Sequence, residues 1–162
     1  MPRRSPASAR SGWGPGDVVL PDRRQADPHR EPVTEPDALL IHDPTLLHQA
    51  DLFAGLAPDG YVLINATQSF DELGLADLAA RHDRTRLLTL PASGLATASL
   101  GRPLPGAPML AGLAAMAGVV SLDAVLAAIS DRFTGQVAAG NTAAASAAFD
   151  YVTAERKELA GA

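Results

Sequence analysis

The chain has 162 residues, of which 47% are hydrophobic and 19% charged, with a formal net charge of −5 and no cysteine. This length and hydrophobic content predict one domain with a substantial core, and the negative charge argues against a nucleic-acid partner, because nucleic-acid-binding modules present a basic face. The lack of cysteine excludes disulfides, a thiol nucleophile and any iron–sulfur cluster held by this chain alone. No hydrophobic run reaches the roughly 20 residues that cross a bilayer, so we expect a cytoplasmic protein without membrane contact.

The first 34 residues are rich in Pro, Ser, Arg and Gly. Such a composition cannot bury enough hydrophobic surface to offset the entropy lost on ordering. Residues 1–34 are therefore predicted to form a disordered or extended segment, with at most a short edge strand at Asp17–Leu20. The α/β domain is predicted over residues 35–158.

The domain begins with a predicted strand, helix and strand. Four consecutive hydrophobic residues, Ala38–Ile41, favour a strand covered on both faces, as in a parallel sheet. Asp43 and Pro44 are typical of a helix start, since the carboxylate can accept bonds from free amides and Pro lacks only an N–H that would be unpaired. Gly55 is expected to end that helix, and Tyr61–Asn65 forms the second strand.

A third strand follows the same pattern. After a polar loop at Thr67–Ser69, a short helix is predicted up to about His82, and Arg86–Leu90 is the next hydrophobic strand. Ser93 is a plausible N-cap for a helix that runs to Leu100.

The rear of the chain is predicted to be helical. The segment 107–119 is hydrophobic on every side, which indicates a helix enclosed by protein whose methionines fill the core. Ser121 caps the next helix, Gly135 ends it, and a last helix spans 137–158. The predicted fold class is α/β: a three-layer, Rossmann-like domain with a mostly parallel sheet and a helical C-terminal half.

Five polar residues lie just beyond the carboxyl ends of the three predicted strands: Asp43, Asn65, Thr67, Ser69 and Ser93. In open α/β sheets ligands bind at this edge, because helix N-termini and loop amides converge there. We therefore treat the five as candidate cofactor-binding residues. The alternative is that they serve only as helix caps and turn residues.

No metal or catalytic site is predicted. His42, Asp43, His48 and Asp51 include metal-binding residue types, but the expected helix places His48 and Asp51 on a solvated face and uses Asp43 as a cap. The sequence has no Gly-x-Ser-x-Gly, P-loop or Gly-x-Gly-x-x-Gly element. Residues alone thus indicate an α/β domain without a visible catalytic constellation.

An ordered series of short segments resembles the γ subunit, or γ domain, of 2-oxoacid (pyruvate/ketoisovalerate):ferredoxin oxidoreductases. No single motif is diagnostic, and the resemblance covers about 35–151. The segments are Glu35–Leu47, Gly60–Asn65, Pro91-Ala92, Pro108–Gly112, Gly118–Leu122 and Asn141.

The resemblance implies a complex that oxidises a 2-oxoacid such as pyruvate to acyl-CoA and CO₂, with electrons passing to ferredoxin. It implies thiamine diphosphate, Mg²⁺, iron–sulfur clusters and CoA in the complex, with none of them bound by this chain alone. The implied partners are α and β subunits and a cluster-bearing δ subunit or ferredoxin. The γ part is expected to act in assembly and in shaping the CoA side of the site.

One departure from the family is visible. Its γ subunits open with a strand and a glycine-rich turn of the Gly-x-Gly-Gly-Gln-Gly kind, which this sequence lacks. We expect that a partner chain covers the corresponding region or that the true start lies upstream. Two other hypotheses stay open: a stand-alone domain that binds a small ligand or nucleotide around Asp43, Asn65 and Thr67, and a degenerate fragment without function.

Overall fold

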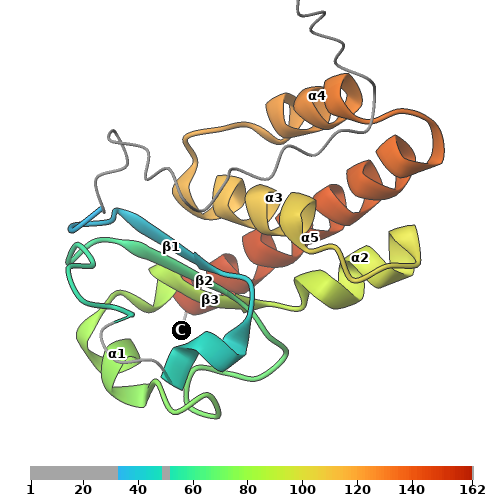
Figure 1. The fold of residues 1–162 in the computed structure, drawn as a ribbon. Coiled ribbons are helices and arrows are strands. Elements are labelled where there is room, and N and C mark those ends of the chain that lie inside the picture. The colour runs from blue at the N-terminus through green and yellow to red at the C-terminus, as the bar shows by residue number, and fades with distance from the viewer. Residues whose placement is uncertain (1–32, 49–51, 162) are drawn as a thin grey trace, which may run out of the picture. The chain divides into compact units, whose positions relative to one another are not determined.

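The computed structural model describes residues 33–48 and 52–161 (Figure 1). The edge strand predicted at Asp17–Leu20 lies outside these residues, and the domain boundary predicted at residue 34 stays a prediction. Within the described residues, no helix is both long and hydrophobic enough to cross a membrane.

The N-terminal half of the described domain contains a three-stranded parallel sheet. Its strands are β1 (Ala38–Ile41), β2 (Tyr61–Asn65) and β3 (Leu87–Leu90), in the order β1-β2-β3. Ala38 pairs with Tyr61, and Val62 pairs with Leu87. The three parallel strands are thus confirmed. β3 begins one residue later than predicted, because Arg86 belongs to a short 3-10 helix, η2 (Arg84–Arg86).

Both faces of the sheet are covered, which confirms the α/β layering (Figure 1). Along β2 the side chains alternate, so that Leu63 joins one hydrophobic cluster while Val62 and Ile64 join the other. The second cluster includes Leu78 of α1 (Ala76–Arg81), the short helix predicted from the sequence.

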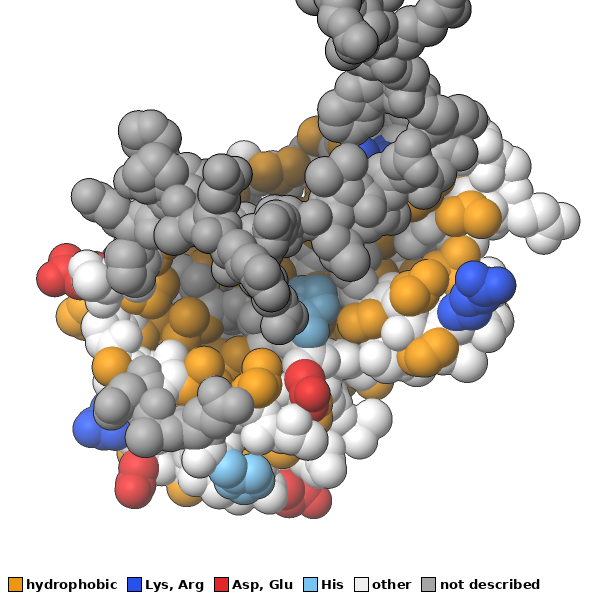
Figure 2. Space-filling view, in the orientation of Figure 1, with side chains coloured by type: hydrophobic (Ala, Val, Ile, Leu, Met, Phe, Trp, Pro, Cys, Tyr) orange, Lys and Arg blue, Asp and Glu red, His pale blue; other side chains and the backbone are white. Residues whose placement is uncertain are grey.

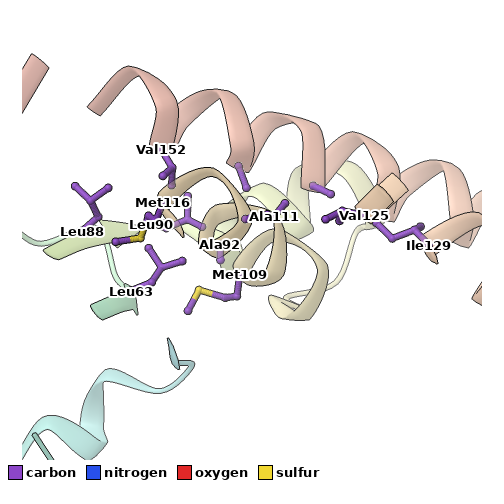
Figure 3. Close-up of a cluster of buried hydrophobic side chains, with 13 residues drawn as sticks. Leu63, Leu88, Leu90, Ala92, Met109, Ala111, Met116, Val125, Ile129 and Val152 are labelled. Carbon is purple, nitrogen blue, oxygen red and sulfur yellow. The ribbon is translucent and has the colours of Figure 1, made fainter. Parts of the chain in front are cut away.

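Four helices form the C-terminal half: α2 (Ala92–Leu100), α3 (Gly106–Ala117), α4 (Leu122–Arg132) and α5 (Gly135–Gly161). α3 packs against β2 and against the long α5. In Figure 3, Leu63, Leu88 and Leu90 of the strands gather with Met109 and Met116 of α3 and with Val152 of α5. Both methionines are fully buried, so their predicted role in the core is confirmed.

Helix α3 approaches the sheet closely because position 112 is glycine. A Cβ atom there would lie 2.9 Å from side-chain carbons of both Leu63 and Leu90. The opposite side of α3 is more open than predicted, since Leu110 is 47% exposed. The prediction of a helix enclosed on every side was wrong at this position, because a hydrophobic sequence cannot tell an internal surface from an exposed one.

The helix predicted after β1 is also shorter than expected. It is a 3-10 helix, η1 (Pro44–His48), and residues 52–55 form a turn. Leu46 donates its N–H to the Asp43 carbonyl, a bond three residues apart that tightens the turn. Gly55 has a φ of 76° and a Cβ there would overlap the Thr34 carbonyl, so this turn requires glycine.

Candidate functional site

The carboxyl ends of the three strands are joined by one side chain, that of Asn65. Its Nδ2 donates to the carbonyl of His42, which follows β1, at 2.9 Å, and to Ser93 Oγ at 2.8 Å. Its Oδ1 accepts from the backbone N–H of Ser93 at 3.0 Å. The structure therefore brings together residues that are 23 and 28 positions apart in the sequence.

An open crevice of about 260 Å³ lies at this edge of the sheet. Three of the predicted residues, Asn65, Thr67 and Ser93, line this crevice. The full lining is Pro44, Asn65, Ala66, Thr67, Gln68, Pro91, Ser93 and Gly94.

Helix α2 begins at the crevice, because Pro91 is its N-cap and Ser93 and Gly94 lie in its first turn. The first amides of a helix have no partner within the helix, and the helix dipole makes this end partly positive. The crevice lining is mainly hydrophobic, and the Thr67 hydroxyl and this end of α2 add polar groups that suit a phosphate or carboxylate.

Ser93 is not the N-cap that its position in the sequence suggested. It is the second residue of α2, and its side chain makes no cap bond. The cap bond comes instead from Asn65, whose Oδ1 accepts from the Ser93 amide. The prediction was wrong because a residue on a neighbouring strand replaced the local cap.

Asp43 lies next to the crevice but is not part of its lining. Its carboxylate accepts from Thr45 Oγ1 at 2.7 Å and from the Thr45 amide at 2.9 Å. These two bonds hold the pKa of the exposed Asp43 carboxyl below its usual value. Its carboxylate therefore acts as the cap of η1.

Ser69 is not part of the crevice lining, although its neighbour Gln68 is. Its amide and its hydroxyl both donate to Glu72 Oε2, at 2.8 and 2.9 Å, and the Glu72 amide donates to Ser69 Oγ at 3.3 Å. This reciprocal pattern is a capping box, and the backbone and hydroxyl bonds from Ser69 lower the pKa of Glu72. The structure therefore separates Ser69 from the other candidates.

Sequence reasoning did not identify four of the lining residues as part of a site: Pro44, Ala66, Gln68 and Gly94. Gly94 offered the only usable signal, since a glycine in the first helical turn leaves the backbone accessible, and a Cβ there would have no atom within 4 Å. Among the residues that the structure describes, no three His, Cys, Asp or Glu side chains are grouped as metal ligands would be.

The fold is that of a Rossmann-like α/β domain with an open crevice at the carboxyl edge of its parallel sheet. The chain belongs to the pyruvate ferredoxin/flavodoxin oxidoreductase family, whose model matches residues 16–151.

Similar proteins agree with this assignment. The chain is 34% identical over 118 residues to the "pyruvate/ketoisovalerate oxidoreductases common subunit gamma" of Pyrococcus abyssi, covering 73% of this chain and 62% of that protein. It is 31% identical over 121 residues to the "pyruvate synthase subunit PorC" of Methanothermobacter marburgensis, covering 75% and 63%.

The fold also resembles the crystal structure of the pyruvate oxidoreductase subunit PORC of Thermotoga maritima, with a TM-score of 0.62 and 26% identity over 73% of this chain and 64% of that one. The chain thus spans less than two thirds of the length of these relatives.

Proposed function

We propose that this chain is the γ subunit, or a truncated γ domain, of a cytoplasmic 2-oxoacid:acceptor oxidoreductase complex. The complex would oxidatively decarboxylate a 2-oxoacid such as pyruvate to acyl-CoA and transfer the electrons to ferredoxin. The main support is the family match over residues 16–151, together with relatives whose names describe them as subunits.

In this proposal the redox and thiamine chemistry belongs to other chains. An iron–sulfur cluster does not fit here, because the chain has no cysteine. We assign thiamine diphosphate and its Mg²⁺ to other chains of the complex as well, as the family resemblance implies. The partners we propose are therefore α and β subunits and a δ subunit or ferredoxin that carries the clusters.

CoA is the cofactor that the crevice suits best. Its phosphate groups match the first turn of α2 and the hydroxyls of Thr67 and Ser93. A volume of about 260 Å³ accommodates only part of such a molecule, so the rest of the CoA site would come from a partner chain. The chain's own contribution would then be to shape one side of that site.

The surface of the helical half supports a role as a subunit. A groove of about 300 Å³ between the start of α3, the end of α4 and the start of α5 is lined by hydrophobic residues, including Leu104, Phe133 and Val137. Leu104 is 53% and Val137 50% exposed. Figure 2 shows exposed hydrophobic side chains at several places on the part of this face that is not drawn in grey. Exposed hydrophobic surface of this kind is typical of a face that a partner covers.

The proposal is tested by coexpression with the thiamine-dependent α and β subunits of the same organism and affinity purification under anaerobic conditions. We expect stable co-purification, CoA-dependent reduction of ferredoxin by pyruvate in the complex, and no turnover by this chain alone. If the two subunits do not co-purify with the chain, the assignment as a subunit fails.

A matched pair of variants sharpens this test. Leu104→Asp places a charge in the hydrophobic groove and should weaken co-purification, because a buried charge without a partner is costly. Ala128→Asp places the same charge on an exposed position of α4 outside the groove and should leave co-purification unchanged. If both variants co-purify with the α and β subunits to the same extent, the groove is not part of the interface.

The crevice also supports a second candidate, a stand-alone domain that binds a nucleotide. Thermal-shift measurements with CoA, thiamine diphosphate and NAD separate the two, because a ligand at 100 times its Kd stabilises the folded state by about 2.7 kcal/mol. Stabilisation by NAD alone favours the stand-alone domain, whereas stabilisation by CoA favours the γ subunit.

A further inference from the structure

The hydrogen-bonding groups of the Asn65 carboxamide are largely occupied by protein. A side-chain amide has two N–H donors, and both are taken, one by the His42 carbonyl and one by Ser93 Oγ. The orientation of the amide follows from its partners, because the His42 carbonyl can only accept and the Ser93 amide can only donate. A ligand could therefore bind Nδ2 only by displacing one of these bonds.

These bonds begin where the sheet ends. The last paired residues of β1 and β2 are Ile41 and Ile64, and Asn65 pairs with Leu90 of β3. His42 follows β1 directly, and its carbonyl accepts a bond from the Asn65 side chain. The carboxamide thus extends the connection between the three strands beyond the backbone ladder.

The same three segments supply the walls of the crevice. Pro44 follows β1, Thr67 follows β2, and Ser93 and Gly94 follow β3. Besides the carboxamide, a backbone bond from the Ala66 N–H to the Leu90 carbonyl, at 3.1 Å, joins the segments after β2 and β3, whereas the Asn65 side chain is what joins them to the segment after β1.

We propose that Asn65 is a positioning residue, which fixes the shape of the crevice by joining the three strand ends and does not bind the ligand itself. This inference rests on the proposed function in that it takes the crevice as the ligand site.

Two substitutions at this position separate positioning from packing. Asn65→Asp keeps an oxygen that accepts from the Ser93 amide, and its second oxygen can accept from the Ser93 hydroxyl. The variant loses the donor to His42, so a carboxylate oxygen would face the His42 carbonyl oxygen. Asn65→Leu is similar in size and removes all three bonds. The aspartate variant should therefore preserve the α2 side and loosen only the β1 side, whereas the leucine variant should loosen both.

Hydrogen exchange of the full chain, followed by mass spectrometry, measures this difference. In Asn65→Asp we expect exchange roughly tenfold faster over residues 41–46 and unchanged over residues 92–96. In Asn65→Leu we expect faster exchange over both segments, with the centre of α5 unchanged as an internal control. Should the leucine variant not fold, Ser93→Ala removes one of the three bonds and should raise exchange over residues 92–96 alone. The proposal is overturned if exchange is unchanged in the aspartate variant or rises equally over both segments.

A ligand measurement separates this inference from the proposed function. With CoA as the probe, Asn65→Leu should lose the thermal shift together with the change in exchange, whereas Thr67→Val should reduce the shift while exchange stays as in the wild type. Loss of the CoA shift in Asn65→Asp without any change in exchange would make Asn65 a direct ligand and overturn the proposal. If neither the wild-type chain nor its complex with the α and β subunits shows a shift with CoA, the proposed CoA role fails, while the exchange data still decide the role of Asn65.

Discussion

Replacing Gly140 with alanine tests how closely α5 and α2 are packed. Gly140 is buried in the interior of α5, where glycine costs about 1 kcal/mol of helix stability relative to alanine. A Cβ atom at this position would lie 2.5 Å from Leu100 Cδ2 and 2.9 Å from the carbonyl oxygen of Ser99. The leucine tip can rotate away, but the backbone oxygen can move only if α2 moves.

The expected magnitude is the difference between two opposing effects. Overpacking of a core typically costs 1–3 kcal/mol, and the backbone contact with Ser99 places Gly140→Ala near the upper end at about 2–3 kcal/mol. The gain in helix propensity offsets about 1 kcal/mol. We therefore expect the free energy of unfolding to fall by about 1–2 kcal/mol in guanidinium chloride titrations followed by circular dichroism.

Two further variants control this measurement. A Cβ at Gly94 meets no atom within 4 Å, so Gly94→Ala should leave the free energy of unfolding unchanged or raise it by up to about 1 kcal/mol. Leu100→Ala removes part of the clash, so the double variant with Gly140→Ala should lose less stability than the sum of the two single variants. Wild-type stability in Gly140→Ala, or strict additivity in the double variant, would refute the close packing of these helices.

Three other predictions follow from the packing and the caps. Met109→Ala should lower the free energy of unfolding by about 2–5 kcal/mol in denaturant titrations, because Met109 is fully buried and its loss leaves a cavity. A loss below 1 kcal/mol would contradict its place in the core. Ser121→Ala should cost about 1 kcal/mol, since Ser121 Oγ accepts from the Ala124 amide at 3.2 Å, and Ser121→Asp should retain the cap. The hydroxyl and amide bonds from Thr45 lower the folded-state pKa of Asp43, so this stabilisation is present above the usual value of 3.8 and is lost as the pH falls through the lower folded-state pKa. In thermal melts from neutral to acid pH, Asp43→Asn should therefore lose stability less steeply than the wild type, and identical slopes would rule out this contribution.

Much of the fold could be predicted from local sequence patterns. Short hydrophobic runs bounded by turn residues marked β1 and β2 at their observed bounds, because strands buried on both faces need continuous hydrophobic residues. Ser121 was identified as the cap of α4, because its partner lies three residues away on the same segment. Such features depend on residues within one or two turns of each other, which a sequence displays directly.

The candidate site could be predicted only in part. The sequence alone placed Asn65, Thr67 and Ser93 at or just beyond the ends of parallel strands, and the carboxyl ends of such strands share one edge of the sheet. Only the tertiary structure decided that Asn65 caps α2 and that Leu110 is exposed. These outcomes depend on strand register and on which surfaces meet. Both are set by contacts between residues far apart in the chain, and local propensity does not encode them.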